Sequence, residues 1–177
     1  ILIRNEKLKN EYLILLKRIK TFVSKINPLF YFWSLFTLSL LMWLITYFHM
    51  FDRFGLGAFD SGIYGNIAFN TASGQPFYSS VLEKNHLGEH FSPIVTIFAP
   101  LYLIKADLRW LLTAQAISFS LVPIIIYRIS GSYTKKKSEK IVVALSLSIL
   151  WLIYTPMRSA MGFPFHPSSI AAPLILL

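Results

Sequence analysis

Residues 29–49 read LFYFWSLFTLSLLMWLITYFH and contain no charged side chain before the histidine that ends them. A helix needs about 20 consecutive apolar residues to cross the hydrocarbon core of a bilayer, so this stretch predicts a transmembrane helix. The rest of the chain agrees, because 55% of its 177 residues are hydrophobic, more than an ordinary soluble domain contains. The sequence therefore predicts an all-α membrane protein.

Three more apolar segments extend this to a polytopic transmembrane helical bundle: 110–128, 141–156 and an unfinished one at 167–177. Segment 93–104 is too short to span comfortably and predicts a juxtamembrane helix. The chain begins without Met and stops inside an apolar run, so we expect it to be an N-terminal portion of a longer protein.

Basic residues are concentrated in two places, which predicts the topology. Residues 1–25 contain seven basic and two acidic residues, and residues 128–140 contain five and one, so +5 and +4 account for the net charge of +9. Cytoplasmic flanks of transmembrane helices are rich in Lys and Arg, so both segments are expected on the cytoplasmic side. The membrane is expected to be an inner or plasma membrane. The predicted order is a cytoplasmic amphipathic helix (1–28), first span (29–49), extracytoplasmic loop with juxtamembrane helices (50–109), second span (110–128), cytoplasmic basic loop (129–140), third span (141–156), extracytoplasmic loop (157–166) and the start of a fourth span (167–177).

The basic N-terminal segment has apolar residues at three- and four-residue spacing and ends at Asn27-Pro28. This pattern is typical of an amphipathic helix lying on a membrane surface. Because it leads directly into a span, we expect its partner to be anionic membrane lipid and not nucleic acid. The sequence does not indicate an oligomeric state.

Residues 86–90 read HLGEH, which matches the H-x-x-E-H pattern of one class of zinc metallopeptidases. A zinc site would need both histidines on one face of a regular helix, yet Gly88 lies between them and Ser92-Pro93 indicates a helix that begins only afterwards. The chain has no cysteine, and no third ligand stands at a suitable spacing. A polar loop at the membrane surface is the better interpretation.

Three predicted helix starts on the outer side contain a polar or ionisable group. Asp60 precedes SGIYGNIAFNTASG, Ser92-Pro93 precedes an apolar run, and His166-Pro167 precedes the last segment. Free N–H groups and the helix dipole make such ends favourable for an anion, especially phosphate. The plainer alternative for Asp60 is that it only caps its helix.

Four sequence blocks occur in a fixed order: FDSGIY at 59–64, NTASGQPF at 70–77, LGEHFSP at 87–93 and FHP at 165–167. Together they resemble the signature of a family of predicted polytopic membrane proteins of unknown function. That family is similar to the GT-C superfamily, glycosyltransferases that use polyprenyl-phosphate sugars at the outer membrane face. The resemblance covers roughly residues 50–177 and implies a GT-C-like fold. One departure is that Pro164 and Ser168 stand beside Phe-His-Pro where the family usually has acidic residues.

The resemblance implies that Asp60 is the catalytic carboxylate, with Asp52 a weaker candidate. An ionised Asp at a helix start can take the proton of an acceptor hydroxyl, and cationic or N–H groups must meet the charge of the leaving phosphate. A divalent cation held by Asp60, Glu89 and His90 is left open, since some GT-C enzymes use one. The residues expected to bind the polyprenyl-phosphate sugar donor are Glu89, His90, His166 and Arg158.

Two other functions stay open. A catalytically silent membrane subunit would share the family signature without the activity. A transporter would place ionisable residues at mid-membrane, whereas the three predicted spans contain none between 29 and 48, 110 and 127, or 141 and 156.

Overall fold

The computed structural model describes residues 6–25, 27–133, 136–163 and 165–175. Within those ranges the protein is an all-α bundle with one antiparallel pair of two-residue strands, which confirms the predicted fold class. The label η marks 3₁₀ helices. The elements are α1 (Glu6–Lys25), α2 (Pro28–Asp52), α3 (Ala58–Ala72), β1 (Tyr78–Ser79), β2 (Lys84–Asn85), η1 (His86–Gly88), η2 (Pro93–Phe98), α4 (Ala99–Ile104), α5 (Arg109–Ser130), α6 (Lys137–Ile153), α7 (Thr155–Gly162) and α8 (Pro167–Leu174).

Helices α2 and α5 are both long and apolar enough to cross a membrane. Helix α5 lies at the centre of the bundle, since α2, α6 and α8 all pack against it. In its most apolar stretch 61% of the residues are buried, against 17% in α2. Helix α2 therefore exposes most of its apolar surface, as a lipid-facing helix does, while α5 forms the core.

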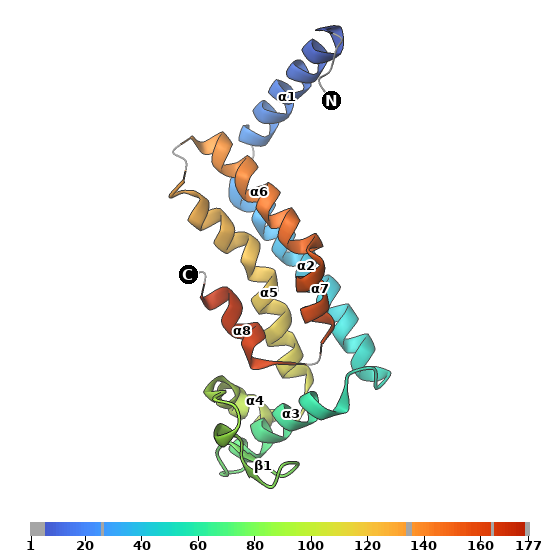
Figure 1. Ribbon diagram of the computed structural model, residues 1–177, viewed down its shortest axis with the longest axis vertical. Coiled ribbons are helices and arrows are strands. Elements are labelled where there is room, and N and C mark those ends of the chain that lie inside the picture. The colour runs from blue at the N-terminus through green and yellow to red at the C-terminus, as the bar shows by residue number, and fades with distance from the viewer. Residues whose placement is uncertain (1–5, 26, 134–135, 164, 176–177) are drawn as a thin grey trace.

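The segment between these two helices folds at one end of the bundle. Figure 1 shows α3, α4 and β1 gathered where α2 ends and α5 begins, whereas α1 and the connection from α5 to α6 lie at the opposite end. Helix α3 packs against η2 and α4. The segment 93–104, expected as one short helix, is a 3₁₀ helix followed by α4.

Helix α1 projects away from the bundle (Figure 1). Its apolar side chains Leu8, Tyr12, Leu15 and Phe22 are each more than half exposed. The boundary expected at Asn27-Pro28 is present, because the Asn27 side chain accepts a hydrogen bond from the backbone N–H of Leu29 and Pro28 begins α2.

The third apolar segment is a helix bent by 50° between α6 and α7. Pro156 has no N–H to donate to the carbonyl of the preceding turn, so the helix breaks just before it. Residues 157–162 then continue as α7, so much of the predicted outer loop is helical. Residue 164 lies outside the described part of the chain.

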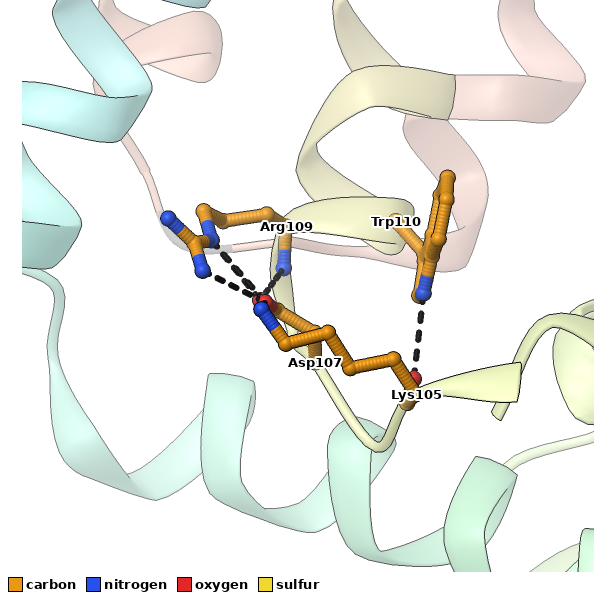
Figure 2. A network of polar contacts seen from close by, with 4 residues as sticks. All are labelled: Lys105, Asp107, Arg109 and Trp110. Carbon is orange, nitrogen blue, oxygen red and sulfur yellow. Dashed lines mark hydrogen bonds and ion pairs between the residues drawn. The ribbon is translucent and has the colours of Figure 1, made fainter. Parts of the chain in front are cut away.

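A charged cluster ties this end of the bundle together (Figure 2). The carboxylate of Asp107, only 8% exposed, accepts hydrogen bonds from the side chain and backbone N–H of Arg109 and pairs with Lys105. The Arg109 guanidinium lies over the rings of Phe48 and Phe51 near the end of α2. The start of α5 is thereby fixed against the end of α2.

Candidate functional site

A cavity of about 310 Å³ lies at the end of the bundle occupied by α3 and η1. Three separate parts of the chain form its wall: the first turns of α3, the segment from Leu82 to His90, and His166 before α8. Four predicted site residues, Asp60, Glu89, His90 and His166, are among those that line it. The remaining lining residues are Phe59, Ile63, Tyr64, Leu82 and His86.

The sequence suggested that Asp60 caps its helix, but the structure shows that it does not. Helix α3 begins at Ala58 and is preceded by Gly57, which makes no side-chain capping bond, so Asp60 stands in the first turn. The helix begins at Ala58, three residues earlier than a cap at Asp60 would place it. A carboxylate in a first turn still gains from the partial positive charge of the helix N-terminus.

Tyr64, one turn after Asp60, packs its ring edge-on against three other rings. The ring centroids lie 5.4 Å from His86, 5.6 Å from His166 and 5.7 Å from Phe165. Burial, and then the charge of Asp60, raise the pKa of the Tyr64 hydroxyl, so it is neutral at physiological pH. Tyr64 therefore joins the histidine before α8 to the histidine of η1.

His86 is buried at 4% exposure, and neither of its ring nitrogens has a hydrogen-bond partner among the residues that the structure describes. Its backbone is fixed, because its N–H donates to the carbonyl of Phe77 and the Asn85 side chain caps η1. Burial, and then the neighbouring His90 with its ring centroid 5.5 Å away, lower the pKa of His86, while Glu89 opposes the shift. His86 is therefore a neutral imidazole whose polar atoms lack partners.

Sequence reasoning assigned His86 no role, because it appeared only in the rejected zinc pattern. Its spacing of four residues from His90 was the available signal. One helical turn brings such residues to the same side, and the backbone N–H groups of Glu89 and His90 both donate to the carbonyl of His86.

Glu89 and His90 are exposed at the rim of the cavity. The Glu89 carboxylate pairs with Lys84 of β2, and this hydrogen bond lowers the pKa of Glu89 below its ordinary value. Glu89 is thus an ionised group whose charge is largely compensated, whereas no hydrogen bond ties the His90 ring in place within the described residues.

The helix start predicted at His166-Pro167 is present, and the structure adds that the His166 side chain caps α8. Its Nδ1 accepts the backbone N–H of Ser168 at 3.4 Å and lies 2.7 Å from the Ser168 hydroxyl. Because Nδ1 accepts this N–H, a neutral His166 has its proton on Nε2. The ring thus retains one N–H donor on the nitrogen that does not serve the cap.

Arg158 is not among the residues that line this cavity. It lies on α7 and lines a different pocket with Trp43, Thr155 and Ser159. Nor does the arrangement fit a cation held jointly by Asp60, Glu89 and His90, because within the described ranges no three His, Asp or Glu side chains are placed to hold one metal ion.

A larger, mostly apolar pocket of about 570 Å³ lies on the opposite face of α3. Residues 61 and 62 face it, whereas 60, 63 and 64 face the polar cavity, as helical periodicity requires. Asp52, the weaker candidate for the catalytic carboxylate, lines this second pocket. Its other lining residues are Phe51, Phe54, Leu56, Gly57, Ser61, Gly62 and Leu108.

The family of predicted membrane proteins DUF2079 matches residues 50–177, and the chain belongs to this family. It is therefore an integral membrane protein. No curated protein and no solved structure matches the chain. The family match begins at the end of α2 and includes every residue that lines the polar cavity.

Proposed function

We propose that this membrane protein is a GT-C-like glycosyltransferase that moves a sugar from a polyprenyl-phosphate donor to an acceptor at the extracytoplasmic face. The observation that carries the proposal is the polar cavity, where Asp60 stands near His86, His90 and His166 at one end of an apolar bundle. At about 310 Å³ the cavity has the size of a small-ligand site.

Asp60 is the general base of the proposed reaction. Its carboxylate takes the proton of an acceptor hydroxyl as the hydroxyl oxygen bonds to the anomeric carbon of the donor sugar. The bond between that carbon and the phosphate oxygen breaks on the opposite face, so the configuration inverts and polyprenyl phosphate leaves.

His90 and His166 bind the phosphate in this scheme. Charge grows on the leaving oxygen, and N–H donors already in place stabilise it without reorganisation. His166 supports this role with an Nε2–H that its cap to Ser168 does not use. Glu89, paired with Lys84, acts on the neighbouring His90 through its charge.

The apolar pocket on the opposite face of α3 supports a lipid-linked donor. Its wall includes Phe51 and Phe54, and it lies where α2, an exposed apolar helix, reaches the end of the bundle. A hydrocarbon chain bound there would be separated from the polar cavity by the width of one helix.

The location in a cell membrane and the cytoplasmic N-terminus are part of the same proposal. The basic helix α1 and the basic start of α6 lie at the end of the bundle opposite the cavity. If basic flanks stay in the cytoplasm, the cavity faces outward, where lipid-linked sugars serve as donors.

The test is transfer by the full-length protein in proteoliposomes containing polyprenyl-phosphate mannose or polyprenyl-phosphate glucose, radiolabelled in the sugar, with an extract of the source cells as acceptor. We expect Asp60→Asn to lower transfer by roughly 100-fold or more, the usual contribution of a general base. Glu11→Gln, on exposed α1 and lining neither the polar cavity nor the apolar pocket, is the control and retains activity. Equal transfer by Asp60→Asn and wild type removes Asp60 as the base. A protein that binds either lipid without any transfer is a silent subunit, and one that moves it across the bilayer is a transporter.

A further inference from the structure

A chain of buried hydrogen bonds crosses the apolar bundle and ends at the cavity. The amide of Gln115 in α5, fully buried, donates through Nε2 to the hydroxyl of Tyr47 in α2 at 2.8 Å. Its Oε1 accepts the backbone N–H of His166 at 3.1 Å. The Tyr47 hydroxyl in turn donates to the sulfur of Met161 in α7 at 3.4 Å.

Burying the Gln115 amide costs free energy, which its hydrogen bonds must offset. Gln115 and Tyr47 are both at 0% exposure within helices surrounded by apolar side chains. A buried amide without partners is destabilising, whereas here both its donor and its acceptor are used. A leucine at this position would fill a similar space and would need no hydrogen-bond partners. Burial of apolar surface alone therefore does not explain why residue 115 is a glutamine.

What the network holds is the segment just before α8. Pro167 has no N–H, the Ser168 N–H is taken by the His166 side chain, and the Ser169 N–H by the His166 carbonyl. The His166 N–H finds its partner in Gln115. One turn further along α5, the Ser118 hydroxyl donates to backbone carbonyls of α8, so one face of α5 holds the first turn of α8 at two points.

We propose that Gln115 is the positioning residue of the cavity: by accepting the His166 N–H and tying it to Tyr47, it fixes where the His166 imidazole stands. The backbone position set by Gln115 lets His166 cap α8 through Nδ1 and meet the ring of Tyr64. The consequence for transfer rests on the proposed function, but the positioning itself does not.

The experiment measures the rate at which diethyl pyrocarbonate modifies His166 in the full-length protein, resolved by mass spectrometry and normalised to His49. The reagent attacks an unprotonated ring nitrogen, and in the folded protein that atom of His166 is engaged by Ser168. Gln115→Met keeps the length of the side chain and removes both hydrogen bonds. We expect it to raise the His166 rate roughly fivefold, the population change that corresponds to one hydrogen bond.

Ser39→Ala is the matched control, because it also removes a buried hydrogen bond between α2 and α5, from Ser120 at 3.1 Å, without touching His166. We expect an unchanged His166 rate in this variant. An unchanged rate in Gln115→Met, or an equal rise in Ser39→Ala, overturns the proposal. If Gln115→Met does not fold, Tyr47→Phe removes only the far end of the network. Tyr47→Phe should then raise the rate of His166 modification by a smaller factor. An unchanged rate in Tyr47→Phe overturns the proposal.

Transfer assays on the same variants separate this inference from the proposed function. Gln115→Met should lose transfer in proportion to its change in His166 reactivity, and Ser39→Ala should retain it. A protein without transfer activity whose His166 reactivity still depends on Gln115 contradicts the glycosyltransferase and leaves the positioning role standing.

Discussion

The Asp107 carboxylate and the Arg109 guanidinium, two residues apart, form a forked pair: Nη2 lies 2.6 Å from Oδ2 and Nε lies 2.9 Å from Oδ1. The pair stands where the chain turns from α4 into α5 (Figure 2). Since Arg109 also covers two rings of α2, Asp107 orients the residue that joins the cavity-bearing end to the spanning helices.

Asp107→Asn should therefore destabilise the folded protein. It replaces a nearly buried ion pair by a hydrogen bond to a neutral amide and leaves the Arg109 charge without its carboxylate, at a cost of about 1–2 kcal/mol. The measurement is thermal unfolding in detergent. Glu139→Gln, which breaks the exposed Lys136–Glu139 pair, is the control and should change stability little. Equal shifts in the two variants would show that the Asp107 pair behaves as a surface pair.

The same pair predicts loss of stability in acid. Hydrogen bonds from Arg109 lower the pKa of Asp107 far below its ordinary value. A depressed folded-state pKa contributes stability above the unfolded value, and this is lost progressively as pH falls from about 5 toward 3 and below. Wild type should lose more thermal stability over this interval than Asp107→Asn. Parallel pH profiles for the two proteins would contradict the assignment.

The spans and the outer helices were predictable because they depend on local pattern. Length and apolarity identified α2 and α5, and His166-Pro167 marked the start of α8. The first residue of α3 was predicted wrongly, because Asp60 suits a cap by residue type whereas the backbone begins the helix directly after Gly57.

The partners around the cavity were harder to predict, since they come from distant parts of the chain. The sequence prediction for the spans rested on ionisable residues and so did not include the uncharged Gln115. Its contact with His166 joins positions 51 residues apart, which no local pattern indicates. His86 was missed because its imidazole was considered only as a zinc ligand. Burial without a partner is a tertiary property that the sequence does not encode locally.

His86→Phe should make the protein less sensitive to mild acid. Burial lowers the pKa of His86 in the folded protein. Below about pH 6.5 the unfolded chain therefore binds a proton at this residue more readily than the folded protein does, and the free energy of unfolding decreases as the pH falls. The groups around this imidazole are His90, Glu89 and Tyr64. Phenylalanine keeps a ring and removes both the titration and the unpartnered nitrogens.

Melting temperatures of wild type and His86→Phe at pH 7.5 and 5.5 provide the measurement. We expect the difference between the two pH values to shrink in the variant. His49→Phe, at the end of α2 and outside the cavity, controls for the general effect of replacing one imidazole by a phenyl ring. A pH difference in His86→Phe as large as in wild type would show that His86 does not titrate in the way its burial implies.

Residues 1–177 contain no cysteine, so a single cysteine introduced among them can test the topology. Ser80, exposed in the segment between β1 and β2, lies at the cavity end, and Ser138 lies in the first turn of α6 at the opposite end. A membrane-impermeant maleimide applied to intact cells should label Ser80→Cys and leave Ser138→Cys unlabelled if, as we propose, the basic residues around position 138 lie in the cytoplasm. Opening the cells should make Ser138→Cys reactive, which confirms that it is accessible. Labelling of Ser138→Cys but not Ser80→Cys in intact cells would place the cavity in the cytoplasm, and with it exclude a donor presented at the outer face.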